Sequence, residues 1–343
     1  MSYAPRRMLV TGGAGFIGCN FVRHILCHDP NVRVVNLDNL TYAGSMDNLC
    51  GLPDEARHTF VKGDICDAPL VDALLRDYEI DTVVHFAAES HVDRSITGPG
   101  EFVRTNVQGT FTLLEAACQF WLNEKDWGEQ DCRFHHVSTD EVYGTLKLDE
   151  AAFTEKSPYA PNSPYSATKA SSDHLVRAWH RTYGLPVTIT NSSNNYGPFQ
   201  NWEKFIPTVI RACLEWKQIP VYGDGTNIRD WLYVEDHCRG IEAVIREGCV
   251  GEFYNIGGKY EIANIEICRI ICGLMDELRP SDNSHASLIQ FVKDRPGHDW
   301  RYALDCRKIT EELCWEARTD FDTGLRKTVE WFLGASTSQP MFS

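Results

Sequence analysis

The chain has 343 residues, of which 43% are hydrophobic and 24% are charged, so it is long enough to bury a substantial core in about two domains. Its net charge of -15 and its pI of about 5.2 argue against a nucleic acid or an acidic membrane surface as the main partner. No apolar run reaches about 18 residues, so we expect no transmembrane helix.

Thirteen cysteines, an odd number, predict reduced thiols in a cytoplasmic protein rather than a disulfide scaffold. Cys268 and Cys272 are four residues apart on a predicted helix, and His24, Cys27 and His28 crowd another. Neither set has the spacing of a closed zinc site, so we expect no bound metal.

The first predicted element is a short buried strand at residues 7–10, which leads into a glycine loop and then an amphipathic helix through about residue 26. The loop contains Gly13-x-Gly15-x-x-Gly18, the fingerprint of a dinucleotide site. Its glycines permit the tight turn, the approach of backbone to a pyrophosphate and close packing of helix on strand.

A second strand, at residues 33–37, ends at Asp38, which lies twenty residues beyond Gly18. A carboxylate there accepts hydrogen bonds from an adenosine ribose and repels a 2′-phosphate. The sequence therefore predicts NAD rather than NADP as the cofactor.

The same alternation continues along the first half of the chain. We predict further strands at residues 59–62, 82–85, 134–137 and 187–190, and helices at residues 69–76 and 102–120. Alternating strands and helices indicate an α/β fold with a Rossmann-like, doubly wound parallel sheet.

The stretch from Ser138 to Lys169 holds most of the groups capable of chemistry. Thr139-Asp140-Glu141 follows a predicted buried strand, and in a parallel sheet that strand end borders the ligand crevice. Tyr165 and Lys169 are four residues apart just after a helix-start signal, so they share one helical face. A nearby lysine is expected to lower the pKa of the tyrosine, by roughly 3 units if the tyrosine is to act as a base near neutrality.

Each of these features also has a purely structural explanation. A Tyr-x-x-x-Lys pattern arises by chance on amphipathic helices, and adjacent acids after a strand often cap a helix N-terminus. Their joint occurrence behind the glycine loop favours catalysis.

After about residue 191 short strands mix with helices, and we predict a smaller mixed α/β substrate domain. Helices are predicted at residues 205–216, 234–247 and 265–278, the last with Asn264 as its cap. Lys204, Arg229 and Arg295 lie in predicted loops, where each is either a surface charge or a ligand contact. The domain division that we predict is 1–190 with 225–250 for NAD, 191–224 with 251–332 for the substrate, and a loose tail at 333–343.

Over residues 7–332 the chain resembles the extended short-chain dehydrogenase/reductases, and among them the nucleotide-sugar 4,6-dehydratases. The general markers are Thr11-Gly12-x-x-Gly15-x-x-Gly18 and Tyr165-x-x-x-Lys169, and the particular marker is Thr139-Asp140-Glu141-Val142-Tyr143-Gly144. The resemblance implies a lyase with tightly bound NAD that converts a nucleoside diphosphate-glucose, dTDP-glucose first, into the 4-keto-6-deoxy sugar by moving a hydride from C4 to C6.

The resemblance also assigns roles to the candidate catalytic residues. Tyr165 takes the proton of the sugar 4-hydroxyl, Thr139 hydrogen-bonds the reacting oxygen, and Lys169 holds the phenolate and the nicotinamide ribose. Glu141 then removes the C5 proton, and Asp140 protonates the departing C6 hydroxyl.

Two further groups of residues follow from the motifs and the resemblance. The expected cofactor-binding residues are Gly12, Gly15, Phe16, Ile17, Gly18, Asp38, Asn39, Thr41, Asp64, Ile65, Ala87, Ala88, Ser90, Thr105, Tyr165, Lys169 and Asn195. The expected substrate-binding residues are His91, Thr139, Asn194, Lys204, Phe205, Pro220, Tyr222, Arg229, Asn264, Arg295 and His298.

The chain departs from the family pattern at Gln200-Asn201-Trp202 and at Phe205, where typical members have an aromatic residue or proline and a leucine. These positions border the expected substrate pocket, so a uridine or cytidine diphosphate sugar stays open. A sugar-nucleotide 4-epimerase and a non-catalytic NAD-sensing regulator are the alternatives of other kinds. Neither needs both carboxylates of Asp140-Glu141.

The resemblance finally implies a homodimer. In the family the helix that carries Tyr165 and the helix at residues 102–120 pack against their copies. Leu175, Val176 and Trp179 would supply apolar area, although the same residues could face the sheet.

Overall fold

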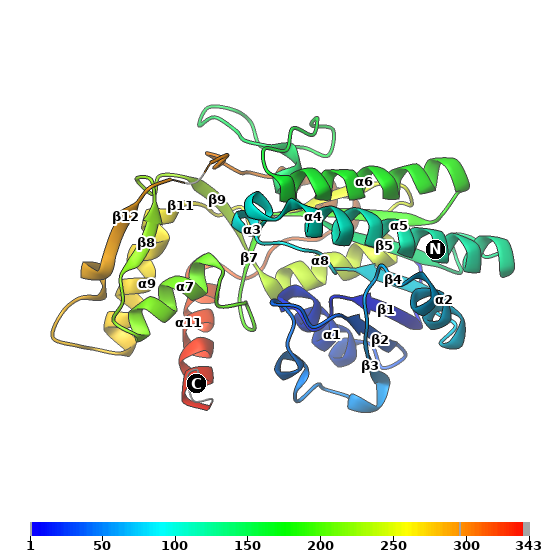
Figure 1. The fold of residues 1–343 in the computed structure, drawn as a ribbon, viewed down its shortest axis with the longest axis horizontal. Coiled ribbons are helices and arrows are strands. Elements are labelled where there is room, and N and C mark those ends of the chain that lie inside the picture. The colour runs from blue at the N-terminus through cyan, green and yellow to red at the C-terminus, as the bar shows by residue number, and fades with distance from the viewer. Residues whose placement is uncertain (1, 295, 339–343) are drawn as a thin grey trace.

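The computed structural model describes residues 2–294 and 296–338 (Figure 1). Its main element is a seven-stranded sheet with the order β10-β6-β5-β4-β1-β2-β3, in which every neighbouring pair is parallel. The strands are β1 (Arg7–Thr11), β2 (Arg33–Asp38), β3 (His58–Lys62), β4 (Thr82–His85), β5 (Arg133–Thr139), β6 (Val187–Ser192) and β10 (Phe253–Ile256). The chain order changes direction between β1 and β4, which is where such sheets bind ligands. The predicted doubly wound sheet is confirmed.

Helices cover both faces of this sheet, because its strands are buried along most of their length and need apolar cover on each side. One core forms beneath α1 (Phe16–His28) and α8 (Val234–Glu247), with α10 (Arg307–Leu313) at its margin. The other forms beneath α2 (Ala68–Asp77), α5 (Thr110–Ala117) and α6 (Pro164–Tyr183). Figure 1 shows α5 and α6 on the opposite side of the sheet from α1 and α8.

The helix predicted at residues 102–120 is a longer run with two stretches of wider, π-helical turn. It comprises α4 (Pro99–Phe102), η3 (Val103–Gly109), α5 and η4 (Cys118–Glu124), and α3 (Val92–Thr97) precedes it. Thr105 and Asn106 lie in the first π-helical stretch, and such stretches recur at functional sites. Asn106 is buried there, donates to the Glu89 carbonyl (3.1 Å) and to the Thr168 hydroxyl (2.9 Å), and so connects this helix to α6.

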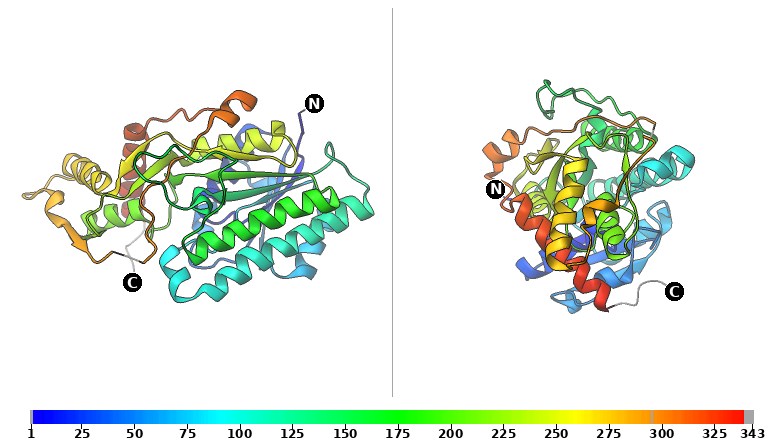
Figure 2. Two further views of the ribbon diagram at one scale, coloured as in Figure 1. Left: turned by 90° about the horizontal axis from the view of Figure 1, so that it is seen from above. Right: turned by 90° about the vertical axis from the view of Figure 1, so that its left-hand side faces the viewer.

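A second lobe stands to one side of the sheet (Figures 1 and 2). It contains a three-stranded sheet of β7 (Asn194–Tyr196), β9 (Ile228–Tyr233) and β11 (Glu261–Ala263), and a two-stranded sheet of β8 (Ile219–Tyr222) and β12 (Ile289–Val292). Its helices are α7 (Phe205–Leu214), α9 (Asn264–Leu278) and α11 (Phe321–Ser338), which share a separate apolar core. Short single-turn segments are η1 (Met46–Leu49), η2 (Glu55–Arg57), η5 (Asp140–Tyr143) and η6 (His285–Leu288).

Three local expectations are wrong. β10 was assigned to the substrate domain, but it pairs with β6 at the edge of the large sheet. The tail predicted at 333–343 is helical as far as Ser338, since α11 continues to that residue, while 339–343 lie outside the described residues. Asn264 is the first residue of α9 rather than its cap, which is Ala263. The division into two domains otherwise stays a prediction.

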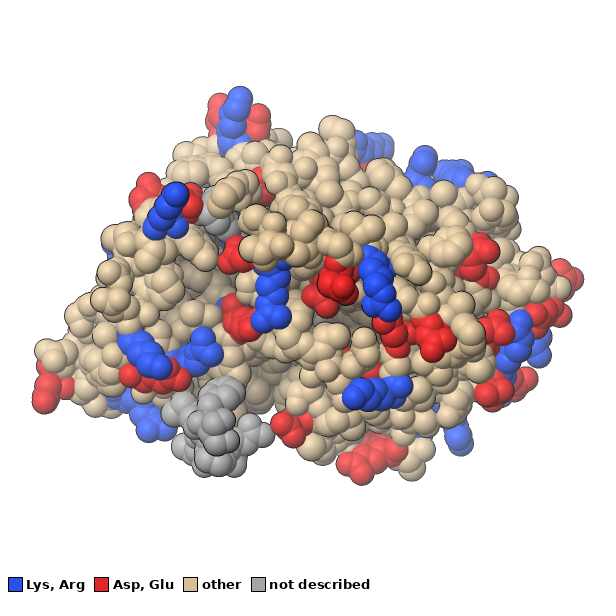
Figure 3. Space-filling model, in the orientation of Figure 1, with Lys and Arg blue, Asp and Glu red and all other residues tan. Residues whose placement is uncertain are grey.

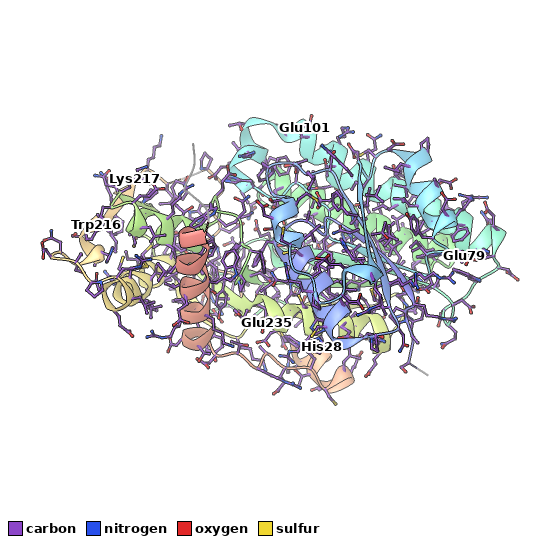
Figure 4. The ribbon with its side chains drawn as sticks, turned by 90° about the horizontal axis from the view of Figure 1, so that it is seen from below. His28, Glu79, Glu101, Trp216, Lys217 and Glu235 are labelled. Carbon is purple, nitrogen blue, oxygen red and sulfur yellow. The ribbon has the colours of Figure 1, made fainter. Side chains whose placement is uncertain are left out.

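The surface carries acidic and basic side chains interspersed on the face drawn in Figure 3. Exposed side chains mark the helix ends in Figure 4, with His28 closing α1 and Glu235 in the first turn of α8. Within the described residues, no helix is long and apolar enough to cross a membrane, and no cluster of three His, Cys, Asp or Glu side chains could hold a metal. All thirteen cysteines are described, and each is a free thiol.

Candidate active site

A cavity of about 300 Å³ lies at the carboxyl ends of the central strands, between the large sheet and the second lobe. Parallel strands all end at the same edge, so the residues that follow β1, β2, β4 and β5 meet there although they are far apart in sequence. All seventeen residues expected to bind the cofactor and all five expected to be catalytic line this cavity.

The glycine loop forms one wall of the cavity, and the structure requires glycine at its positions for different reasons. Gly12 adopts a positive φ of +72°, and a Cβ there would lie 2.7 Å from the backbone nitrogen of Ala87. A Cβ on Gly18 would lie 2.3 Å from the Gly12 carbonyl oxygen, whereas Gly15 opens into the cavity. These contacts let α1 begin directly against the loop.

The start of α1 is suited to a negatively charged group. Within the described residues, no side chain caps this helix and no acid lies in its first turn. The backbone N–H groups of that turn and the helix dipole therefore favour a phosphate in the cavity. The loop and helix start fit the pyrophosphate of NAD.

Asp38 lies at the end of β2 with 8% of its surface exposed. One carboxylate oxygen accepts from the Ala14 amide (2.9 Å) and the other from the Leu40 amide (2.8 Å). Burial raises the pKa of Asp38, and these two hydrogen bonds oppose the rise. Each oxygen keeps a further lone pair for a ribose hydroxyl, and the negative charge disfavours a 2′-phosphate.

Asp140 is a buried acid at the point where β5 turns into η5. It is 1% exposed, and one of its oxygens accepts from the Thr139 hydroxyl at 3.3 Å. Its other oxygen has no hydrogen-bond partner within the described part of the chain. Burial, followed by the charges of Glu141 and Asp230, raises the pKa of Asp140 well above its usual value. A raised pKa favours the protonated side chain, which is the form that can donate a proton.

Tyr165 and Lys169 lie in the first turns of α6, which is fixed by a capping box. The Ser163 hydroxyl accepts from the Ser166 amide (3.1 Å), the Ser166 hydroxyl accepts from the Ser163 amide (3.0 Å), and Pro164 occupies the first turn. Both functional side chains are buried against the cavity, as the four-residue spacing predicts.

The expected effect of Lys169 on Tyr165 is wrong for the protein alone. The Lys169 amino group donates to the Val137 carbonyl at 2.9 Å, and burial lowers its pKa to about 8. Burial and the Glu141 charge raise the pKa of Tyr165 well above 10. Tyr165 is therefore neutral, because the strongest charge acting on it is negative.

Several residues that line the cavity were not predicted. They are Leu37, Ala43, Gly44, Gly63, Phe86, Glu89, Val137, Ser138, Ser192, Ser193, Gln200 and Asn201. Ser138 and Ser192 end β5 and β6, so the rule that located Thr139 would also have found them. Gln200 and Asn201 lie on the loop before α7. The sequence places them beside the expected substrate pocket as departures from the family pattern, but it predicts no ligand contact for them.

The expected substrate residues are less concentrated than the cofactor residues. Thr139, Asn194 and Lys204 line the cavity, and the Lys204 amino group donates to the Ser90 carbonyl at 2.8 Å. The others that the structure describes lie outside its lining: His91, Phe205, Pro220, Tyr222, Arg229, Asn264 and His298. Arg295 lies outside the described residues.

The interactions of four of these residues are defined. The Arg229 guanidinium donates to the carbonyls of Ile228 (2.8 Å) and Asp299 (3.0 Å). The Tyr222 hydroxyl donates to Asp93 at 3.2 Å. His298 lies 2.7 Å from the Asp294 carboxylate, and the Phe205 ring stacks on Trp231.

The chain matches the family model described as GDP-mannose 4,6 dehydratase over residues 9–328. It is 54% identical to a dTDP-glucose 4,6-dehydratase of Neisseria meningitidis serogroup B, over 97% of this chain and 94% of that protein. A dTDP-glucose 4,6-dehydratase from Streptomyces venezuelae, solved with NAD and dTDP bound, is 48% identical with a TM-score of 0.88 over 97% of this chain and 99% of its own.

Structural similarity extends beyond dehydratases. A UDP-glucose 4-epimerase of Thermotoga maritima, solved with UDP-glucose, superposes with a TM-score of 0.83 over 96% of this chain and 99% of its own, at 26% identity. The fold is therefore shared by enzymes of both kinds.

Proposed function

Because the chain belongs to the GDP-mannose 4,6 dehydratase family, we propose that it is an NAD-dependent lyase that converts dTDP-glucose into the 4-keto-6-deoxy sugar. The observation that carries the proposal is the buried Asp140, whose pKa is raised, next to Glu141 and in one cavity with Tyr165. The 54% identity to a dTDP-glucose 4,6-dehydratase supports the same substrate.

NAD bound in the cavity would accept a hydride from C4 of the sugar and return it to C6. The first turn of α1 and the glycine loop hold its pyrophosphate, and Asp38 accepts hydrogen bonds from the adenosine ribose. A redox-neutral cycle does not release the cofactor, so the protein should purify with NAD bound. Isolation without NAD, or with NADP preferred, would contradict this assignment.

In the first half-reaction Tyr165 accepts the proton of the sugar 4-hydroxyl. Its raised pKa means that the phenolate forms only when positive charge is brought into the cavity, and the oxidised nicotinamide ring carries such a charge. Thr139 hydrogen-bonds the reacting oxygen, and Lys169 contributes a buried cation one turn along α6.

In the second half-reaction the 4-keto group acidifies C5, and the two adjacent carboxyl groups divide the work. Glu141 removes the C5 proton, and Asp140 gives its proton to the departing C6 hydroxyl. Two close carboxyl groups push their pKa values apart, so one acts as base and the other as acid. An epimerase has no step for this acid.

Substrate recognition falls to the second lobe. We assign the diphosphate to Asn194, Lys204, Arg229, Asn264 and Arg295, with Tyr222 beside the nucleotide base. Lys204 is the member of this set that lines the cavity with a full positive charge. A few local cations of this kind allow a protein of net charge -15 to bind an anion.

Isotopes test the reaction directly. With substrate deuterated at C4, the label should appear at C6, and in deuterated water solvent deuterium should appear at C5. In Glu141→Gln, oxidation at C4 should continue while elimination slows by about 10²- to 10⁴-fold, so reduced cofactor accumulates. Return of the label to C4 of an inverted sugar would identify an epimerase.

A parallel assay tests the nucleotide. The protein is incubated separately with dTDP-glucose, UDP-glucose and CDP-glucose, and the alkali-induced absorbance of the 4-keto product is followed. The highest kcat/KM is expected with dTDP-glucose. Gln200-Asn201-Trp202 and Phe205 depart from the family pattern beside the pocket, so a preference for UDP- or CDP-glucose is the outcome that would change the assignment.

We also propose a homodimer formed through α5 and α6. Phe111 and Tyr183 are 44% and 54% exposed on these helices, and Trp179 contacts both rings, edge-to-face with Phe111 and at a tilt with Tyr183. Val176 faces the sheet core instead, and Leu175 packs beside it. Light scattering at micromolar concentration should give twice the mass of one chain.

The free thiols agree with the cytoplasmic location expected from the sequence.

A further inference from the structure

Asp173 is a buried carboxylate on α6, one helical turn beyond Lys169, and the mechanism above gives it no role. Its side chain has no exposed surface. Aspartate is almost never buried to this degree without partners, because removing its charge from water is costly. Its surroundings therefore indicate what the carboxylate does.

Three donors converge on one oxygen of Asp173. They are the Ser138 hydroxyl (2.9 Å), the Tyr159 hydroxyl (2.8 Å) and the Asn191 amide (3.3 Å). The other oxygen lies 3.1 Å from Nε2 of His136. Burial raises the pKa of Asp173, whereas the charge of Lys169 and the three donated hydrogen bonds oppose that rise, so these partners favour the charged carboxylate.

The same contacts reach the catalytic strand end. Ser138 immediately precedes Thr139 in β5, and the Asn191 amide on β6 also donates to the Thr139 carbonyl at 3.2 Å. Asp173 thus joins α6 to the ends of β5 and β6. A shift of its carboxylate would move Thr139 relative to Tyr165.

Titratable groups on β4, β5, η5 and α6 surround Lys169. They are His85 on β4, His136 on β5, Asp140 and Glu141 in η5, and Tyr165 and Asp173 on α6, with Tyr143 and Tyr159 behind Asp173. Burial lowers the pKa of both histidines well below 6.5 and raises those of the three tyrosines, so these groups are neutral. Asp173 is the group whose charge opposes the effect of burial on the pKa of Lys169.

We propose that Asp173 is a positioning residue for C4 oxidation: its carboxylate keeps Lys169 in the ammonium form and fixes the strand end that carries Thr139. The lysine itself donates to a backbone carbonyl, a neutral acceptor that supplies no countercharge. This inference rests on the proposed function, in which Lys169 acts as a cation beside Tyr165.

The test measures C4 oxidation alone, in a Glu141→Gln parent that accumulates reduced cofactor. Reduction of bound NAD is followed by stopped-flow absorbance after mixing with dTDP-glucose, between pH 6 and pH 10. In the parent, the rate should fall as pH rises through the pKa of Lys169, which is about 8. Adding Asp173→Asn, which keeps the shape and removes the charge, should move the midpoint of this fall in rate down by about one pH unit. The rate should then be lower about fivefold at pH 8 and about tenfold at pH 9 and above.

Two further variants separate charge from packing. Tyr159→Phe removes one hydrogen bond to the Asp173 carboxylate but leaves its charge. The alkaline limb of the pH–rate profile, where the rate falls as pH rises, should therefore have the same midpoint in this variant as in the parent. Asp173→Glu should restore the position of the limb, even where its maximal rate is lower. If Asp173→Asn lowers the rate by one factor at every pH and leaves the limb in place, Asp173 only supports packing and the proposal fails.

A second measurement applies if Asp173→Asn does not fold. Lysine labelled with ¹³C at Cε allows the titration of Lys169 to be followed by NMR, with its signal assigned by its loss in Lys169→Met. An ammonium form at pH 7 supports the proposal, and a neutral amine at pH 7 overturns it. Failure of the Glu141→Gln parent to reduce NAD would instead contradict the proposed function, and the lysine titration would still test Asp173.

Discussion

All seventeen residues assigned to the cofactor line one cavity, whereas among the described residues of the substrate set only Thr139, Asn194 and Lys204 do so. The cofactor side is built from segments that follow the strands of a single parallel sheet, so the topology brings them to one edge. The substrate side draws on β8, β9, α7 and α9, which belong to separate small sheets and helices. Sequence motifs therefore predict the residues of a site well when those residues follow the strands of one sheet. They predict them poorly when the residues come from several separate elements.

We expect the largest effect from a substitution in the catalytic centre, where the cofactor-binding and substrate-binding residues meet. Tyr165→Phe should lower the rate of product formation by about 10²- to 10⁴-fold and leave bound NAD oxidised, because no other group takes the 4-hydroxyl proton. Tyr143→Phe is the control, since Tyr143 donates to Asn255 (2.9 Å) and does not line the cavity. Product formation at the normal rate by Tyr165→Phe would remove the tyrosine from the mechanism.

The next effect belongs to the cofactor side. In Gly18→Ala the new Cβ would lie 2.3 Å from the Gly12 carbonyl oxygen, a backbone atom that cannot move without opening the loop. We expect a loss of about 1 to 3 kcal/mol in unfolding free energy and less NAD per purified chain, measured by urea unfolding and by absorbance after extraction.

A matched control for Gly18 is available in the second lobe. Gly273 lies within α9, and an added Cβ would meet nothing within 4 Å. Gly273→Ala should therefore raise the unfolding free energy by about 0.5 to 1 kcal/mol and leave the NAD content unchanged. Equal NAD loss in both variants would mean that the glycine loop has no special role.

A smaller effect is expected on the substrate side. Lys204→Met should raise KM for the nucleotide sugar about tenfold and change kcat less than twofold, because the lost charge contributes to binding and not to the reaction. Lys217→Met is the control, since this exposed lysine lies at the outer end of the second lobe (Figure 4). A fall in kcat at constant KM would place Lys204 in the chemical step.

We expect the smallest effect on the free energy of unfolding, from a substitution at Asp140, which lies between the cofactor-binding and substrate-binding residues. The raised pKa of Asp140 means that the folded protein holds a proton which the unfolded chain releases above about pH 4, so folding loses stability as pH rises toward the folded pKa. Asp140→Asn removes this loss and should be more stable than the parent at pH 7.5, although it turns over slowly.

Urea unfolding at pH 5 and at pH 7.5, with saturating NAD, measures this difference. The gap between the variant and the parent should widen at the higher pH. A constant gap would show that Asp140 is ionised in the folded protein, and its role as the acid would then be wrong.

Local patterns identified the sheet-forming strands, the glycine loop, Asp38 and the pair on α6, because each depends on spacing within one or two adjacent elements. Periodicity also located α8 and α9. It did not predict α11, and it predicted a loose tail from residue 333 where that helix continues to Ser338, because Gly334 and the polar residues after it lack helical periodicity. It also missed the place of β10 beside β6, because strand order is a property of the packed sheet.

The sequence by itself determined the fold class, the dinucleotide site and the identity of the acid pair, since residue type and spacing set the backbone turns, helical faces and charges that these require. Tertiary structure decided the ionisation states. Burial raises the pKa of Asp140 and of Tyr165 and lowers the pKa of Lys169, and α6 places Asp173 one helical turn from that lysine. A pKa depends on the distances and solvent exposure that exist only after the chain has packed, so no local pattern contains it.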